Sequence, residues 1–200
     1  MLKIGITGNI GSGKTTVSKV FEVLGIPCFY ADDAAKTVMT TDEILIKGIK
    51  SAFGETSYFD DGTLNRKHIA EIVFNDKEQL AKLNSLVHPA TFRAFDAWVK
   101  SISGVPYVLK EAALLFESDA HKFCDYTIIV KAPLETRIKR VMERDGLPRD
   151  EVEKREANQF PEEKKAKLAD YIIVNNDKQL VIPQVLELHR GFLFISSSVH

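Results

Sequence analysis

The chain has 200 residues, of which 44% are apolar and 28% are charged, and its formal net charge at pH 7 is −1. These fractions exclude a largely disordered or collagen-like chain, and the length suits one domain with an embellishment or two small lobes. The near-neutral charge lacks the basic footprint of a nucleic-acid-binding protein, and no apolar run approaches the roughly 20 residues that a membrane span requires.

The predicted elements begin with a short, β-branched strand at residues 2–7, which enters a glycine-rich turn. Apolar residues spaced for one face of a helix follow over residues 17–24, and Gly25 and Pro27 are typical of a helix end. Further short apolar runs, expected to be strands, lie at residues 26–30, 106–109, 126–130 and 171–174. Short apolar strands that alternate with helices indicate βαβ units and a buried parallel sheet.

Two helical segments interrupt this alternation. Residues 36–104 form an all-helical insert, and residues 135–167 form a charge-rich helical segment in which the run 164–167 is expected to be a solvated face. Neither segment has the composition of a linker, so we expect both to be excursions from one core. That core then consists of residues 1–35, 105–134 and 168–200.

A complete G-x-x-x-x-G-K-[ST] motif occupies residues 8–15, between the first strand and the first helix. Its glycines let successive backbone N–H groups converge on one anion, at the positive end of the helix that follows. Lys14 supplies a charge to the β- and γ-phosphates of a nucleotide, and Thr15 supplies a hydroxyl to Mg²⁺. The expected nucleotide-binding residues are Gly8, Gly11, Ser12, Gly13, Lys14, Thr15 and Thr16. The sequence therefore predicts an α/β fold of the P-loop NTP-hydrolase type, with a parallel sheet flanked by helices, a helical substrate-binding insert and a helical lid.

Sequence features outside the motif limit the classes of nucleotide-binding protein to which the chain can belong. The DxxG and NKxD motifs of GTPases are absent from the sequence, whereas a helical insert and a basic flap are typical of a small-molecule kinase. A nucleoside monophosphate kinase and a non-catalytic ATP-sensing module remain alternatives. The cysteines Cys28 and Cys124 form no CxxC motif, and the sequence starts without a long apolar stretch, so we expect a cytoplasmic enzyme with no structural metal or disulfide. Its oligomeric state is not readable.

Asp32 is the most informative side chain outside the motif, because it follows the second strand, where parallel sheets bind ligands. A carboxylate there can orient an acceptor hydroxyl and take its proton during phosphoryl transfer. Asp33 competes for this role, and either residue has the alternative task of capping a helix that begins near Ala34.

Taken together, these residues and further motifs along the chain resemble those of the bacterial dephospho-coenzyme A kinases. The resemblance rests, in chain order, on GNIGSGKTT, Tyr30-Ala31-Asp32, LNSLVHP ending at His88-Pro89, Ala113 to Glu117 (ALLFE), Arg140 with Arg144-Asp145, Arg155 with Gln159, and Ala169-Asp170-Tyr171 with Asn175. Two departures stand out: Tyr30 replaces the first Asp of the family's D-x-D, and Ala113 replaces a Pro. The resemblance implies ATP-dependent phosphorylation of the ribose 3′-hydroxyl of dephospho-coenzyme A, the last step of coenzyme A synthesis.

The resemblance also suggests roles for individual residues. Lys14, Asp32, Arg140 and Arg144 are the expected catalytic residues, with Arg137 near enough in sequence to join the arginines over the transferring phosphoryl group. Expected acceptor-binding residues are Asp32, His88, Leu115, Phe116 and Glu117.

Several of these residues have a structural alternative. The helix that carries Arg137, Arg140 and Arg144 could instead be a solvent-exposed helix stabilised by ion pairs such as Glu135–Lys139. Glu111 is a candidate to hold Mg²⁺ through a water, or is simply a polar strand end. His88 could instead belong to a turn and cap at a helix junction. Glu117 could instead form an ion pair that stabilises its turn. Phe116 either lines the acceptor site or packs beneath it.

Overall fold

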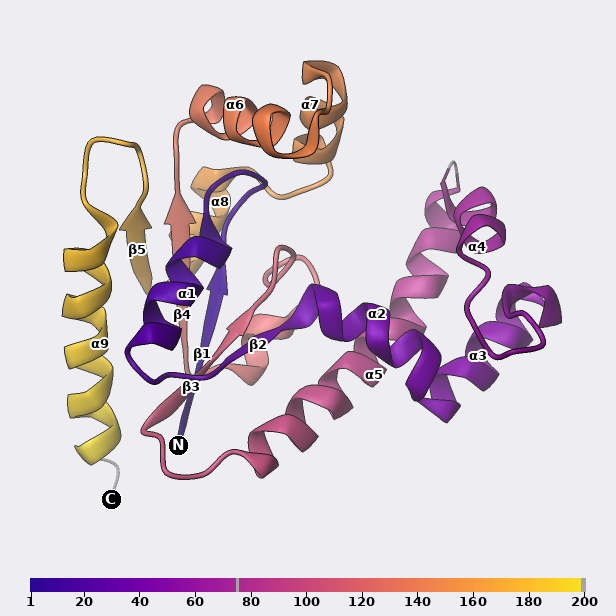
Figure 1. Cartoon of the computed structure of the whole chain (residues 1–200), viewed down its shortest axis with the longest axis horizontal. Helices are drawn as coiled ribbons and strands as arrows, with labels where there is room; N and C mark the ends of the chain where they lie inside the picture. Colours follow the sequence, from indigo (N-terminus) through magenta and orange to yellow (C-terminus); the bar gives the residue numbers. More distant parts are fainter. Residues whose placement is uncertain (75, 199–200) are drawn as a thin grey trace. The chain divides into compact units, whose positions relative to one another are not determined.

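The computed structural model describes residues 1–74 and 76–198, which fall into two compact units. The sheet unit consists of Met1–Tyr30 and Ser103–His200, and the helical unit consists of Ala31–Ile102. Figure 1 labels the elements of both units.

The sheet unit contains the strands and a set of helices. Its elements are β1 (Leu2–Thr7), α1 (Lys14–Val23), β2 (Cys28–Tyr30), β3 (Tyr107–Glu111), the 3₁₀ helix η2 (Ala120–Phe123), β4 (Tyr126–Lys131), α6 (Leu134–Asp145), α7 (Arg149–Ala157), α8 (Glu162–Leu168), β5 (Tyr171–Val174) and α9 (Val181–Ser198). The five strands are all parallel in the order β2-β3-β1-β4-β5. This confirms the predicted parallel sheet flanked by helices and places β1, with the loop that follows it, at the sheet centre.

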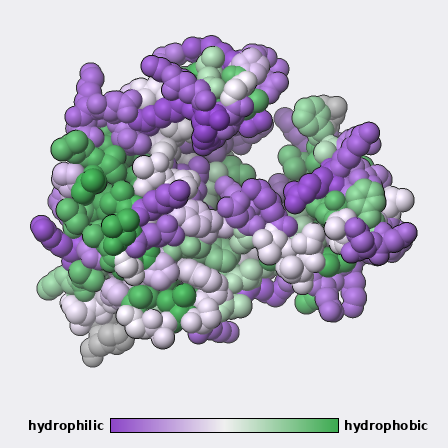
Figure 2. All heavy atoms as spheres, in the orientation of Figure 1, coloured by the Kyte–Doolittle hydropathy of each residue, from purple (hydrophilic) through white to green (hydrophobic). Residues whose placement is uncertain are grey.

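One face of the sheet carries the main core. Alternate side chains of β1, including Ile4 and Ile6, point to the same face and pack with Phe21 of α1 and Phe192 of α9. Figure 1 shows α1 and α9 side by side along the sheet. Within α9, Phe192 is buried in this core and Ile195 packs against it, so these two side chains hold the helix on the sheet. The outer surface of α9 remains apolar, with Phe194 73% exposed, and hydrophobic spheres gather there in Figure 2.

The opposite face of the sheet is covered by the turn that follows β3. Leu115 is fully buried, and it lies so close to β1 that a Cβ on Gly5 would be 2.8 Å from its Cδ2. The turn is further held by the hydroxyl of Thr7, which donates to the carbonyl oxygen of Ala113 at 3.3 Å. This position of the turn, directly beyond the end of β1, brings it near the glycine-rich loop.

Helices α6 and α7 form a small apolar cluster of their own. Ile138 and Val141 of α6 and Val152 of α7 are buried together, and Ile10 of the glycine-rich loop packs against them. The outer surface of these helices is largely hydrophilic (Figure 2). The charge-rich segment therefore has one apolar contact face, and that face is applied to the loop.

The helical unit is built around a long helix. Its elements are α2 (Ala31–Thr41), α3 (Glu43–Phe53), the 3₁₀ helix η1 (Glu55–Ser57), α4 (Arg66–Val73) and α5 (Lys77–Ser101). Its buried core residues, which come from all four α-helices and the loops between them, include Leu45, Ile49, Leu83 and Val87. Helix α5 continues through Pro89, so the expectation that His88-Pro89 forms a turn and cap at a helix junction is wrong.

Asp42 ties two helices of this unit together. Its carboxylate caps α3 by accepting from Leu45 N–H at 2.8 Å, and it accepts bidentate hydrogen bonds from Arg93 of α5. Although partial burial raises the pKa of Asp42, the hydrogen bonds from Arg93 and the backbone lower it overall from its ordinary value of 3.8.

Among the described residues, no helix has the length and apolarity needed to span a membrane.

Candidate functional site

The glycine-rich loop, residues 8–13, connects β1 to the N-terminus of α1. Its centre is a turn in which Ser12 N–H donates to the carbonyl oxygen of Asn9 at 3.0 Å, and α1 begins at Lys14. The first N–H groups of a helix have no partner within the helix, so they are available to an anion lying in the loop. The predicted strand–loop–helix arrangement is therefore present, with Lys14 and Thr15 in the first helical turn.

Two glycines are required by the loop's close neighbours as well as by its backbone. Gly11 has φ 77°, and a Cβ there would be 2.3 Å from the carbonyl oxygen of Arg137. Gly13 has φ 88°, and a Cβ there would be 2.3 Å from Nδ2 of Asn175. These positive φ angles favour glycine at both positions, and at Gly11 a side chain would also overlap the backbone of α6.

Lys14, Thr15 and Glu111 meet beside the loop. The Thr15 hydroxyl donates to Oε2 of Glu111 at 2.9 Å, and Nζ of Lys14 lies 3.9 Å from Oε1 of the same carboxylate. Glu111 ends β3 and is only 6% exposed. A hydroxyl and a carboxylate are hard oxygen ligands of the kind that Mg²⁺ prefers, and the ammonium completes an anion site next to them. The residues present thus fit a nucleotide–Mg²⁺ complex, and the structure brings the two predicted Mg²⁺ candidates, Thr15 and Glu111, into contact.

A pocket opens over this group. It is lined by Gly11, Gly13, Lys14, Thr15, Thr16, Arg140, Val141 and Arg144. The structure thus brings both predicted arginines of α6 to the same pocket as five of the seven predicted nucleotide-binding residues; Gly8 and Ser12 do not line it.

The two arginines are held differently. Arg140 donates to the carbonyl oxygens of Gly11 and Asn175 and forms an ion pair with Asp177 at 2.5 Å. Arg144 pairs with its neighbour Asp145 at 2.7 Å, and this hydrogen bond raises its pKa, while its side chain stays 65% exposed. Arg140 is therefore fixed against the loop, and Arg144 is anchored but accessible from the pocket.

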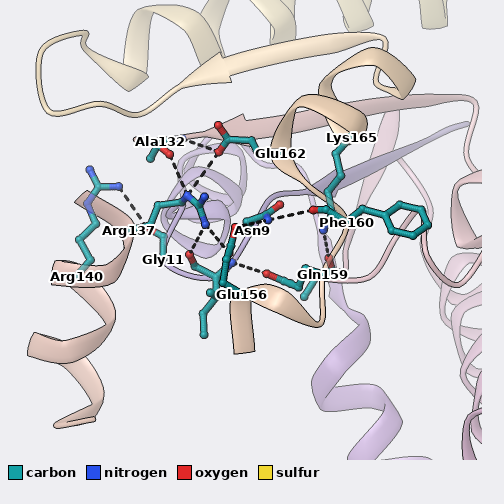
Figure 3. Close-up of polar contacts among 12 residues, drawn as sticks. Asn9, Gly11, Ala132, Arg137, Arg140, Glu156, Gln159, Phe160, Glu162 and Lys165 are labelled. Carbon is teal, nitrogen blue, oxygen red and sulfur yellow. Dashed lines mark hydrogen bonds and ion pairs between the residues drawn. The ribbon is translucent and has the colours of Figure 1, made fainter. Parts of the chain in front are cut away.

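Arg137 does not join them over the pocket. Its side chain is 5% exposed, and its guanidinium donates to the carbonyl oxygen of Ala132 at 2.9 Å and to Glu156 at 2.6 Å, with Glu162 at 3.6 Å (Figure 3). The sequence expectation that it contacts a phosphoryl group is corrected, because its donors are directed into the protein. The alternative pairing of Glu135 with Lys139 is corrected as well, since Glu135 pairs with Arg149 and Lys139 with Glu143.

Glu117 forms a buried ion pair. Its Oε1 lies 2.8 Å from Nζ of Lys165 and accepts from Phe160 N–H at 2.8 Å. Lys165 is fully buried and also donates to the carbonyl oxygen of Ala113 at 3.0 Å. Burial lowers the pKa of Lys165, against the opposing effect of Glu117. The expectation that residues 164–167 are a solvated face is therefore wrong at Lys165, whose partner lies in a distant part of the sequence.

The apolar residues of the same turn are packed rather than open. Leu115 is fully buried beneath the turn, and Phe116 is 4% exposed with its ring 5.1 Å from that of His121. For these two residues the structure favours packing beneath the site, and contact with an acceptor stays a prediction.

The remaining predicted residues lie in the helical unit. Asp32 is exposed in the first turn of α2, two residues beyond the end of β2, and Asp33 beside it pairs with Lys36 at 2.7 Å. The helix begins at Ala31 rather than near Ala34, so neither carboxylate lies ahead of it as a cap. His88 is partly buried within α5, with its ring 6.5 Å from that of Phe92.

Tyr30, the residue that departs from the family motif, belongs to the sheet unit. Its hydroxyl donates to Glu22 of α1 at 3.0 Å, so it fastens β2 to α1.

Three polar contacts to the loop were not foreseen from the sequence. Asn175 donates to the carbonyl oxygen of Ser12 at 2.8 Å, Gln159 accepts from Ile10 N–H at 2.8 Å, and Asn9 donates to Glu156 at 2.8 Å (Figure 3 shows the last two). Asn175 and Gln159 belong to the motifs that carry the family resemblance, and this was the one available sign that they have a task.

Comparison with known proteins gives a consistent result. A sequence model of the family described as dephospho-CoA kinase matches residues 2–180. A dephospho-CoA kinase of Bacteroides fragilis is 33% identical over 199 residues, which cover all of this chain and 95% of that protein. One from Chlorobium chlorochromatii is 40% identical over 181 residues, covering 88% of this chain and 85% of that protein. A crystal structure of a Thermus thermophilus protein has a TM-score of 0.83 at 36% identity, covering 95% of this chain and 96% of that one.

Proposed function

The chain belongs to the dephospho-CoA kinase family, and from this premise we propose that it transfers the γ-phosphoryl group of ATP to the ribose 3′-hydroxyl of dephospho-coenzyme A. The products are coenzyme A and ADP, and the reaction requires Mg²⁺. The observation that carries the proposal is the meeting of Lys14, Thr15 and Glu111 beside a loop that has glycine at its positive-φ positions.

The groups in and around the loop have different roles in phosphoryl transfer. The backbone N–H groups of Gly11 and of residues 13–16, together with the Lys14 ammonium, bind the phosphates of ATP and stabilise charge on the equatorial oxygens of the transferred group. The Thr15 hydroxyl and Glu111, the latter through a water, would hold Mg²⁺, which when bound would neutralise negative charge on the phosphates. Arg140 and Arg144 line the same pocket and add guanidinium donors to the developing charge.

Asp32 is the proposed acceptor-side carboxylate. It follows β2 by two residues, and ligands of parallel sheets bind beyond the carboxyl ends of the strands. Because it is exposed in the first turn of a helix, it is free to accept a hydrogen bond from the ribose hydroxyl and to receive its proton. With Tyr30 bound to Glu22, no second carboxylate of a D-x-D pair exists to share this role.

The proposal assigns the acceptor to the helical segment and closure to the charge-rich segment. We expect residues 36–104, including His88, to bind much of the elongated dephospho-coenzyme A, and residues 135–167 to close over ATP. Glu117 and Phe116 would then act on the acceptor through the turn that they stabilise, since their side chains are committed to Lys165 and His121.

The test is an acceptor panel. Purified protein is incubated with ATP and Mg²⁺ and with dephospho-coenzyme A, AMP, CMP or shikimate, and the product is analysed by mass spectrometry and by ³¹P NMR. We expect phosphorylation of dephospho-coenzyme A alone, with a new monoester phosphorus coupled to the ribose 3′ proton. Turnover of a nucleoside monophosphate instead would refute the acceptor, and ATP binding without turnover of any acceptor would favour a sensing module.

A further inference from the structure

Three successive carbonyl oxygens of the phosphate loop each accept a hydrogen bond from a side chain outside the loop. The pairs are Arg137 Nη1 to Ile10 O at 3.4 Å, Arg140 Nη1 to Gly11 O at 3.4 Å, and Asn175 Nδ2 to Ser12 O at 2.8 Å. Two of the donors come from α6 and the third from the residue that follows β5. We call these three side chains the carbonyl clamp.

The donors of the clamp are themselves fixed. Arg137 is held by Ala132 O and by the carboxylates of Glu156 and Glu162, as Figure 3 shows. The backbone N–H of Asn175 donates to the carbonyl oxygen of Lys131 at 2.8 Å, which attaches it to the end of β4. The clamp side chains are thus held in place by the sheet and by helices α6, α7 and α8, and not by the loop itself.

Holding a carbonyl group also orients the N–H group of the next residue. In a trans peptide the C=O and the following N–H point in opposite directions, and the described residues contain no cis peptide bond. When Ile10 O faces Arg137, the N–H of Gly11 therefore faces away from it, and when Ser12 O faces Asn175, the N–H of Gly13 faces away likewise. The N–H of Ser12, between them, is used within the loop by Asn9 O.

A glycine-rich loop has many accessible conformations, and ordering it on ligand binding costs conformational entropy. A clamp that fixes the peptide planes beforehand reduces this cost, because donors that are already aimed at an anion need no reorganisation. We propose that Arg137 and Asn175 are positioning residues that aim the N–H groups of Gly11 and Gly13 at the phosphates of ATP. This inference rests on the proposed function and adds residues that contact the loop rather than the nucleotide.

The experiment compares Asn175→Ala and Arg137→Lys with a control, Lys122→Ala, whose exposed side chain pairs with the exposed carboxylate of Asp119. Each protein is prepared with ¹⁵N-glycine, and its glycine amide signals, its melting temperature, its affinity for ATP with Mg²⁺ by calorimetry and its KM for dephospho-coenzyme A are measured. Asn175→Ala removes the Ser12 contact without leaving a buried charge, so it remains informative if Arg137→Lys fails to fold.

We expect Asn175→Ala to weaken ATP binding by about tenfold or more while the KM for dephospho-coenzyme A stays near the wild-type value. The amide signal of Gly13 shifts in this variant and that of Gly11 shifts in Arg137→Lys, whereas Gly54, Gly62 and Gly104 keep their positions. Lys122→Ala matches the wild type throughout.

The inference is overturned if both clamp variants bind ATP as the wild type does with unchanged Gly11 and Gly13 signals. It is also overturned if all glycine signals shift together with a matching loss of melting temperature, since the side chains then support only the fold. Because the amide signals and ATP affinity are read without an acceptor, a wild-type protein that binds ATP but leaves dephospho-coenzyme A unmodified would refute the proposed function alone.

Discussion

The close contact between Gly11 and helix α6 can be tested by Gly11→Ala, with Gly25→Ala as the matched control. Both glycines have a positive φ, 77° and 84°, but a Cβ on Gly25 would meet no atom within 4 Å, whereas one on Gly11 would lie 2.3 Å from the Arg137 carbonyl oxygen. The two variants therefore share the cost of a left-handed alanine and differ in the overlap with α6.

The magnitudes follow from this difference. A left-handed non-glycine residue costs about 1–2 kcal/mol, which is the whole effect expected for Gly25→Ala. Overpacking against backbone that must shift adds about 1–3 kcal/mol, so Gly11→Ala should lose about 2–5 kcal/mol of unfolding free energy if α6 holds its place. Where α6 instead moves away, stability is partly kept and the loop is distorted, which weakens ATP binding.

Urea denaturation and calorimetric titration with ATP separate these outcomes. We expect Gly11→Ala to be worse than Gly25→Ala in stability, in ATP affinity by at least about tenfold, or in both. A Gly11→Ala protein that matches Gly25→Ala in both measurements would refute the close approach of α6 to the loop.

Three further predictions concern other parts of the chain. Asp32→Asn should leave ATP affinity near the wild-type value and lower turnover, because the carboxylate acts on the acceptor; a loss of ATP binding in calorimetry would contradict this role. Thr15→Val should raise the Mg²⁺ concentration needed for half-maximal activity, and an unchanged Mg²⁺ dependence in the kinase assay would argue against a metal contact. Asp42→Ala should cost about 1–2 kcal/mol of stability, more than Asp76→Ala, which removes a helix cap without an ion pair. Since the pKa of Asp42 is lowered on folding, its contribution is present above pH 3.8 and is lost as the pH falls through the folded-state value; equal losses for the two variants in denaturation at pH 7 would contradict the role of its arginine partner.

The sequence predicts the elements around the loop closely, because they are specified by local patterns. Residues 2–7 and 171–174 are strands as expected, and the helix after the motif ends just before Gly25. The second strand is shorter than expected, starting at Cys28, because Pro27 lacks an N–H for a sheet hydrogen bond. The third strand extends to Glu111, because Lys110 and Glu111 pair with β1 on one side and with β2 on the other.

The burial of charged side chains and the identity of their ion-pair partners were much less predictable from the sequence. Arg137 and Lys165 lie in helices rich in charged residues, and a single sequence does not show which of these cations meets a carboxylate in the fold. Each is buried because a carboxylate far away in the sequence meets it, Glu156 in one case and Glu117 in the other. Such pairings depend on tertiary packing, which a single sequence does not display.

The most direct test of the central claim is a calorimetric titration of ATP with Mg²⁺ into the wild-type protein and into Lys14→Ala, followed by turnover with dephospho-coenzyme A. We expect the wild type to bind one ATP and to form coenzyme A, and the variant to lose turnover by on the order of 10³-fold while its melting temperature stays close to that of the wild type. Equal turnover in the two proteins, or no ATP binding by the wild type, would contradict the assignment of the loop as the triphosphate site.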